Sequence, residues 1–244
     1  MSVILSPKIY VGQYDLTGFA NQGQPTSNTE KKDPTTFGDA ATNGGCRRVE
    51  AGFETVALKA KIFWKANSVS PQSHDIALAN WKVADTPVSW CPQTGAAGEY
   101  CQFFKAIEVG YSQSGKIGDY LMADLEASAT GASPNIYGTI VDVGTKVAGA
   151  NGASRQLGLI GATQKMYALV HIFALSGGTF TLKVQSDDNS GFTSPIDRIT
   201  FAGATVPGWQ WLELAGPIAS DNYWRSSYTL TGGSVAFALH VGIL

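Results

Sequence analysis

The chain has 244 residues, of which 44% are hydrophobic and 15% are charged, against about 25% charged in an average globular protein. This composition excludes a disordered protein and a coiled coil, and a net charge of -2 without a basic block argues against a groove that follows nucleic-acid phosphates. The 28 glycines and 10 prolines interrupt regular structure so often that short strands are favoured over long helices.

The sequence also lacks the features of a membrane or secreted protein. No stretch reaches the roughly 18 consecutive apolar residues of a membrane span, and the first residues lack the basic and apolar regions of a secretory signal. We therefore expect a soluble chain that is made in the cytoplasm of its host and has neither a membrane nor a specific nucleic acid as a partner.

The first half is predicted to be a β domain with one long loop. Residues 3–19 are predicted to form a short strand or a strand pair. Residues 20–45 are rich in Asn, Gln, Gly, Thr, Asp and Pro, which predicts a polar loop of a length that is usually functional or disordered. In a structural protein such a loop commonly reaches a neighbouring subunit.

Further elements of the first half follow from the periodicity of apolar residues. Residues 55–65 alternate between apolar and polar side chains, which predicts a strand with one wet face. Residues 73–84 carry the only helical spacing in the chain, begun by a serine suited to capping, and predict one short helix. Strands are predicted again at 88–91, 100–111 and 120–129.

The second half is predicted to be an antiparallel sandwich or jelly roll. We place the boundary near residue 131, at a small, polar segment that contains a proline. Beyond it, residues 166–175 and 179–186 have strand patterns, and residues 223–230 and 234–243 are predicted to form a terminal hairpin around Gly232 and Gly233. The predicted fold is mainly all-β, with two antiparallel sandwich or barrel-like domains and one short helix in the first.

The sequence contains no recognisable catalytic set. His171 and His240 lie in apolar stretches without a suitably spaced carboxylate or cysteine, so hydrogen-bonded core imidazoles are favoured over a metal site. His74 with Asp75 is expected to be a polar pair in the first turn of the helix. A nucleophile elbow and the phosphate-binding glycine motifs are missing. We predict that the protein is not an enzyme and has no catalytic residues, no cofactor and no metal.

Charged residues in the second half are expected to stabilise loops. Residues 186–192 resemble half of a calcium loop, but their order favours a hairpin turn. Asp197 with Arg198, and Asp221 with Arg225, are predicted to form ion pairs.

The three cysteines have no spacing typical of a zinc knuckle or a redox motif. Cys91 and Cys101 flank a turn-rich segment and can face each other across a hairpin. Two small buried hydrophobic residues are favoured there, and a disulfide formed in an oxidising medium is the alternative.

Aromatic residues of the second half offer a binding alternative. Trp209, Trp211 and Trp224 are candidates for a platform that binds a sugar, with carboxylate and amide side chains beside them in the sequence. In an all-β domain with this many aromatic residues, a packing role is favoured.

Short motifs in the first half resemble structural proteins of tailed-bacteriophage virions. They are IYVGQYDLTG at 9–18, DPTTFGD at 33–39, RRV at 47–49 and AGF at 51–53. The later segment GDYLMADLEA at 118–127 is similar to the returning strand of the tail-tube type. The resemblance covers residues 3–130, and the second half resembles a β domain of phage virion proteins.

The resemblance implies a structural protein that self-assembles into rings or a lattice in the virion, with a tail tube favoured. A decoration (cement) protein that trimerises on the head is the alternative, and a carbohydrate-binding module on the particle is a more distant one. The expected partners are copies of the chain, as hexamers or trimers, and other virion proteins. Residues 1–130 are expected to assemble and residues 131–244 to form an outer β domain. The assembly contacts are expected in the long loop and just after it, at Thr36, Phe37, Gly38, Asp39, Arg47 and Arg48.

Overall fold

The computed structural model describes residues 7–18, 20–32, 50–63, 85–116, 119 and 122–244, and its regular elements in this part of the chain are all β-strands. The prediction of a mainly β fold is therefore confirmed for the described residues. The predicted helix at 73–84 lies outside them, as do Cys46 and His74. The described part contains no helix that is long and apolar enough to cross a membrane.

Sixteen strands are described. They are β1 (Lys8–Val11), β2 (Tyr14–Asp15), β3 (Ala20–Lys32), β4 (Glu50–Phe63), β5 (Thr86–Cys91), β6 (Tyr100–Ser114), β7 (Met122–Ala129), β8 (Ile136–Lys146), β9 (Ala150–Asn151), β10 (Arg155–Gln156), β11 (Lys165–Ser176), β12 (Phe180–Asp187), β13 (Ile196–Thr200), β14 (Gly208–Ala215), β15 (Tyr223–Leu230) and β16 (Ser234–Ile243).

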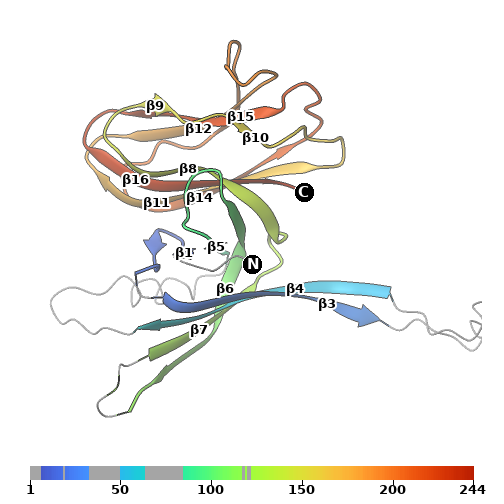
Figure 1. Cartoon of the computed structure of the whole chain (residues 1–244), viewed down its shortest axis with the longest axis vertical. Coiled ribbons are helices and arrows are strands. Elements are labelled where there is room, and N and C mark those ends of the chain that lie inside the picture. The colour runs from blue at the N-terminus through green and yellow to red at the C-terminus, as the bar shows by residue number, and fades with distance from the viewer. Residues whose placement is uncertain (1–6, 19, 33–49, 64–84, 117–118, 120–121) are drawn as a thin grey trace, which may run out of the picture.

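The larger sheet has eleven strands and runs through both halves of the chain (Figure 1). Its main path is β14-β11-β16-β8-β6-β5-β1-β2, and a branch leaves β6 through β7 and β4 to β3. Neighbouring strands are antiparallel along the path and the branch. The strands of the first half therefore belong to the same hydrogen-bonded sheet as β8, β16, β11 and β14 of the second half.

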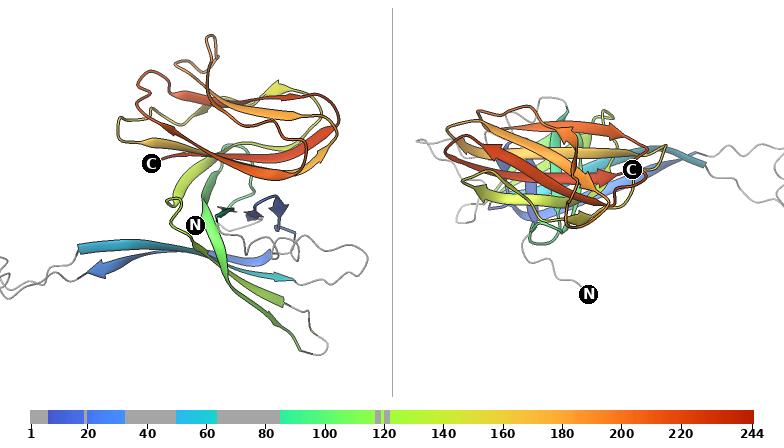
Figure 2. Two further views of the ribbon diagram at one scale, coloured as in Figure 1. Left: turned by 180° about the vertical axis from the view of Figure 1, so that it is seen from behind. Right: turned by 90° about the horizontal axis from the view of Figure 1, so that it is seen from above.

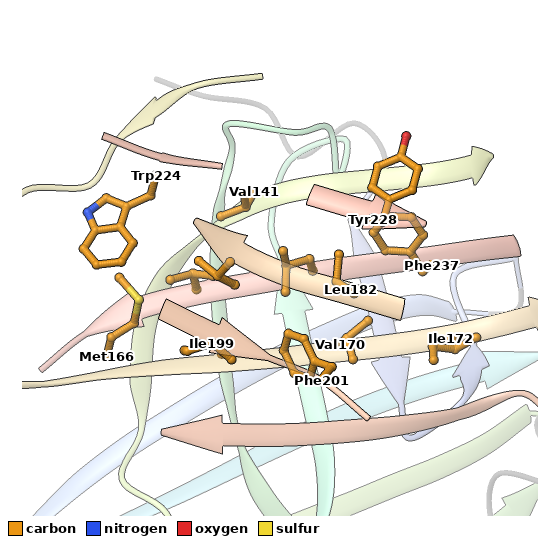
Figure 3. Packing of buried hydrophobic residues seen from close by; sticks show 14 of the residues in the cluster. Val141, Met166, Val170, Ile172, Leu182, Ile199, Phe201, Trp224, Tyr228 and Phe237 are labelled. Carbon is orange, nitrogen blue, oxygen red and sulfur yellow. The ribbon is translucent and has the colours of Figure 1, made fainter. Parts of the chain in front are cut away.

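The second half forms a β-sandwich. A five-stranded sheet, ordered β10-β15-β12-β13 with β9 beside β15, covers one face of β8, β16, β11 and β14 (Figures 1 and 2). Phe180, Leu182 and Val184 of β12 point inward, as their spacing predicts. They meet side chains of the opposite sheet such as Val170 and Phe237 in one buried cluster (Figure 3).

The predicted terminal hairpin is wrong. β15 pairs with β12, whereas β16 pairs with β11 and β8, so the two strands lie in opposite sheets of the sandwich. The connection at Gly232 and Gly233 has positive φ at both glycines, and a Cβ on Gly233 would lie 1.4 Å from the carbonyl oxygen of Ser176. A glycine-containing turn predicts where the chain reverses, but long-range ladders decide which strands pair.

The strand predicted at 55–65 is confirmed as part of β4, with Val56, Leu58 and Ile62 buried. The loop predicted at 20–45 is wrong for its first half, because Ala20–Lys32 forms β3 and pairs along β4. The composition of β3 favours a loop, but the long edge of β4 offers backbone partners for the whole segment. The remaining loop residues lie outside the described part.

The fifteen-residue strand β6 links the two halves. Its first residues pair with β8 of the second half, and its last residues pair with β7 of the first. The ladder from Tyr100 to Phe103 thus crosses the boundary that the sequence suggests at residue 131. The division into 1–130 and 131–244 stays a prediction.

Candidate assembly surface

Four strands of the first half form a curved sheet that we call the wing: β3, β4, β7 and residues 106–114 of β6. It extends away from the sandwich in Figure 2. One of its faces is apolar and is covered by β1 and β5 of the same chain. The buried side chains of this cluster include Val56, Leu58, Ala60, Ile62, Ala123, Leu125 and Ala127 from the wing and Ile9, Val11, Val88 and Trp90 from the cover.

The other face of the wing is polar and has a regular order. Cross-strand registers place Gln24, Lys59 and Glu126 in one row, and a second row holds Gln22, Lys61 and Asp124. Lys59 Nζ lies 3.1 Å from Glu126 Oε1, and Lys61 Nζ lies 3.4 Å from Asp124 Oδ1. The rows line a shallow hollow of about 480 Å³. The two lysines balance the two carboxylates, so this face is polar without a dominant charge.

Both outer edges of the wing lack a ladder partner among the described residues. β3 pairs with β4 alone, and beyond Ala106 β6 pairs with β7 alone. Pro25 lies within β3, and proline, which has no N–H group, is confined to edge strands, strand starts and bulges. An unpaired strand edge presents N–H and C=O groups to any chain that can add a strand. Within the described part of the chain, the two outer edges of the wing are thus edge strands with free ladder positions.

The residues predicted to make assembly contacts cannot be placed on this surface. Thr36, Phe37, Gly38, Asp39, Arg47 and Arg48 lie outside the described part of the chain. They follow β3 or precede β4 in sequence, and their role stays a prediction.

A second site, which we call the joint, lies where β1 and β5 pack on the outer face of β11 and β16. Its centre is polar: Ser89 Oγ lies 2.8 Å from His171 Nε2 and 2.8 Å from His240 Nδ1. The Nδ1 of His171 lies 2.5 Å from the carbonyl oxygen of Gly12. The Tyr10 ring lies over both imidazoles, with its centroid 5.6 Å and 5.7 Å from theirs. All three polar side chains are fully buried.

Burial controls the protonation of the joint. It lowers the pKa of His171 to about 4, although the hydrogen bond to Gly12 acts in the opposite direction. It also lowers the pKa of His240 well below its ordinary value, and the neighbouring His171 lowers it further. The prediction of hydrogen-bonded core histidines is confirmed. Ser89 was not predicted from the sequence. The feature that points to it is its place as a polar residue in the wholly buried strand β5.

The structure does not bring the three tryptophans together. Trp224 is fully buried on β15 and donates from Nε1 to the carbonyl oxygen of Gly158 at 2.8 Å. Trp209 and Trp211 lie on β14 in the other sheet, and the Trp211 ring meets Phe103 edge to face at 5.5 Å. Trp209 is 38% exposed, but its ring lies against Gly12. Trp224 and Trp211 thus pack against other parts of the chain, and a sugar-binding role for the three tryptophans stays a prediction.

The predicted ion pairs of the second half are wrong in their partners. Asp221 pairs with Arg198, at 2.9 Å, rather than with Arg225. Asp197 pairs with Lys183, and Arg225 donates to Gln185. The pair of Asp197 with Lys183 joins the neighbouring strands β12 and β13, and the pair of Asp221 with Arg198 joins β13 to the segment before β15.

The predicted turn after β12 is confirmed. Asp187 accepts hydrogen bonds from the backbone N–H groups of Asn189 and Ser194, and Asn189 accepts one from Gly191. The described residues contain no group of three or more histidine, cysteine or acidic residues that could hold a metal ion.

Cys91 and Cys101 are free thiols, and both are buried. Burial raises the pKa of the Cys91 thiol to about 12 and that of Cys101 well above its ordinary value. Both thiols therefore stay protonated and pack with Tyr10, Phe103 and their neighbours. The favoured prediction of two small buried hydrophobic residues is confirmed.

No protein-family model matches the sequence, and a search of curated proteins finds no match. Among solved structures, the chain is similar to a component of the virion of a native gene transfer agent (GTA) particle, with 12% identity, 54% of this chain and 95% of the other covered, and a TM-score of 0.42. A chain from the tail of an empty GTA particle, refined with C6 symmetry, has 13% identity, 55% and 94% coverage and a TM-score of 0.39.

A third similar structure is the SPP1 Dit protein, described as a paradigm of the hub adsorption apparatus in phages that infect Gram-positive bacteria. It has 10% identity, 98% and 99% coverage and a TM-score of 0.37. The descriptions of the three structures name a virion, a tail and a phage adsorption apparatus.

Proposed function

We propose that this chain is a structural, non-catalytic protein of a tailed-phage virion that assembles by joining the wing of one copy to the wing of the next. The observation that carries the proposal is the pair of strand edges that have no ladder partner among the described residues, β3 on one side of the wing and residues 106–114 of β6 on the other. Each copy thus offers two different edges to two different neighbours.

The strand directions fit this mode of addition. The wing has the order β3-β4-β7-β6, and each pair is antiparallel, so β3 and β6 run in opposite directions. When β3 of one copy lies beside β6 of the next, the new pair is antiparallel as well. A head-to-tail contact of this kind closes into a ring if the rotation between copies closes, and otherwise continues as a helical filament.

The two faces of the wing support a tube as the assembled object. Its apolar face is already covered by β1 and β5, so only the polar face with the Lys59 and Lys61 rows is left for solvent. A closed sheet made of such copies has one continuous wetted surface and no strand edges. We favour a tail tube for this reason. A trimeric decoration protein would instead leave the edges of the wing unpaired or use them on a lattice.

The sandwich is expected to lie outside the assembled sheet. It buries its own core between two sheets, and the side chain of Gln210 bonds both backbone groups of Ala202 at 2.8 Å, which covers the gap between β13 and β14. The Gln210 side chain thus links β14 to the segment that follows β13, so the two sheets are also joined at this side of the sandwich. In this proposal the chain is located in the virion, with its copies and other virion proteins as partners.

Paired cysteines test the contact between wings. Gln22 or Gln24 on β3 and Ser112 or Ser114 on β6 are changed to Cys in the four pairwise combinations, which allow for the register between copies. Opposite residues of adjacent strands have Cβ atoms about 4.5–5.5 Å apart, close enough for a disulfide. We expect oxidation of the concentrated chain to give a ladder of linked oligomers for at least one combination.

The controls are the single variants and the pair Gln24→Cys with Thr205→Cys, which places the second thiol on an exposed residue of the sandwich. These should give dimers at most. A chain that stays monomeric at high concentration, and in which no combination cross-links beyond the controls, would contradict assembly through the wing.

A further inference from the structure

The joint contains a chain of hydrogen bonds whose proton positions follow from its geometry. A carbonyl oxygen only accepts, so His171 must donate from Nδ1 to Gly12. In a neutral imidazole Nε2 is then a bare acceptor, and the Ser89 hydroxyl donates to it. Ser89 Oγ in turn accepts from Nδ1 of His240. This arrangement uses the hydroxyl proton and one of its lone pairs, and it requires that His171 is neutral.

The last atom of this chain is Nε2 of His240, which is buried and has no hydrogen-bond partner. In the neutral tautomer this nitrogen carries no proton. A proton added at Nε2 would be a buried donor with no acceptor. Because the centroids of the two imidazoles are only 5.3 Å apart, a charge on one ring would also disfavour a charge on the other. The closed joint therefore has no place for a second proton on either ring.

We propose that the His171–Ser89–His240 chain is an acid-sensitive latch, which holds β1 and β5 on β11 and β16 while its imidazoles are neutral and releases them when both are protonated, with the sandwich still folded. If both rings were charged, each would present a donor to Ser89 Oγ. The hydroxyl could accept both, but its own proton would lose its acceptor, and two like charges would be left in an apolar environment.

The groups that face the imidazoles do not offset this effect. Tyr10 comes from β1, and burial raises its pKa far above the ordinary value, so it stays neutral in acid. Phe103 of β6 and Phe173 of β11 are apolar. Behind Tyr10 lie the neutral thiols of Cys91 and Cys101, and Asp15 on β2 acts on Tyr10. Within the described residues no carboxylate is hydrogen-bonded to either ring to stabilise an imidazolium.

The latch is specific to the joint because of where the histidines lie. The chain has three histidines, and two of them are at this site. Along β11, Val170 and Ile172 face the core of the sandwich, while His171 faces the joint. The buried polar pairs inside the sandwich, such as Asp142 with Ser226, contain no imidazole. Between about pH 4.5 and 6, acid therefore acts on the joint rather than on the sandwich.

Hydrogen exchange of the unassembled full-length chain tests the latch without reference to assembly. The amides of β1 and β5 are bonded within the ladder that joins β1, β5 and β6, so the released strands are expected to open this ladder as well. After correction for the intrinsic exchange rate, the opening constant of these amides is measured between pH 6 and 4.5. Two imidazoles that bind protons only in the open state should raise the opening constant about 100-fold for each unit by which the pH falls. Amides of β12 and β15 should show no such dependence.

The variant His240→Asn removes one titrating group, and its side-chain N–H₂ can still donate to Ser89 as Nδ1 does. We expect its opening constant to rise only about 10-fold for each unit of pH. The matched control is Ser226→Ala in the sandwich, which removes a buried hydroxyl bonded to Asp142 and should keep the 100-fold dependence in β1 and β5.

The pH dependence of the opening constant in the wild-type chain tests the latch even if the His240→Asn variant does not fold. Exchange in β1 and β5 that is independent of pH, or that changes together with the sandwich in one global transition, would overturn the proposal. Equal slopes in the wild type and a folded His240→Asn variant would also overturn it.

Discussion

In the sandwich, several buried polar side chains are hydrogen-bonded to one another, whereas the wing has a polar face and two strand edges without a ladder partner among the described residues. Ser226 donates to Asp142, and Arg198 and Ser186 both reach Asp221. The ion pairs of the wing are exposed, and its edge strand β3 is thirteen residues long. The sandwich therefore joins its charged and polar side chains across its own strands, while the wing has backbone groups that are available for the proposed contact with a neighbouring copy.

The largest expected effect is in the core of the sandwich. Trp224 is fully buried and its indole N–H has a backbone partner, so Trp224→Ala should lower the free energy of unfolding by about 3–5 kcal/mol. Denaturant titration at neutral pH measures this loss. Trp209→Ala, at a partly exposed ring, is the comparison variant and should cost clearly less. Equal losses of unfolding free energy in the two variants would contradict the placement of Trp224 in the core of the sandwich.

A smaller effect is expected at the pair that joins β13 to the segment before β15. Burial tends to raise the pKa of Asp221, but hydrogen bonds from Arg198, Ser186 and Ser220 outweigh it and lower the pKa to about 2. A carboxyl whose pKa is depressed in the folded state adds stability above its ordinary pKa, and this stability is lost as the pH falls toward 2.

The substitution Asp221→Asn should therefore lower the free energy of unfolding at pH 7 by about 2 kcal/mol, the equivalent of the shift from 3.8 to about 2. At pH 2 the difference between the two proteins should have largely disappeared. Urea unfolding at both pH values checks this. A difference that is the same at pH 7 and pH 2 would assign the loss to packing rather than to charge.

The smallest effect is expected on the polar face of the wing. Lys59 and Glu126 are about half exposed, and such pairs contribute about 0–1 kcal/mol. Lys59→Ala should therefore change the free energy of unfolding by less than about 1 kcal/mol in a denaturant titration. A larger loss would mean that this face is buried between copies in the sample. Repeating the titration at a lower protein concentration distinguishes a monomer with an exposed face from an assembly in which the face is buried.

The sequence predicts best where a strand has one buried and one exposed face. The alternation in β4 and β12 places their inward residues correctly, because the period of two is set by the strand itself. It predicts poorly where pairing depends on a distant strand. β3 has the composition of a loop and is a strand because β4 lies beside it, and β15 and β16 are joined by a tight turn yet pair in different sheets.

The candidate sites show the same limit. The alternation in β4 and β7 predicts the polar face of the wing, but the unpaired edges follow only from the topology. The joint brings together Ser89, His171 and His240. The two histidines are 82 and 151 positions from the serine along the chain, and no local sequence pattern predicts a contact over such separations. A lone serine in an apolar strand was the one available signal.

The most direct test of assembly through the wing is hydrogen exchange of the chain before and after it assembles. The account predicts that β3 and residues 106–114 of β6 gain protection on assembly, because their free backbone groups enter new ladders. Amides of the sandwich edges β13 and β14 should exchange as before. Protection gained at β13 or β14, with β3 and β6 unchanged, would contradict the account and assign assembly to the sandwich.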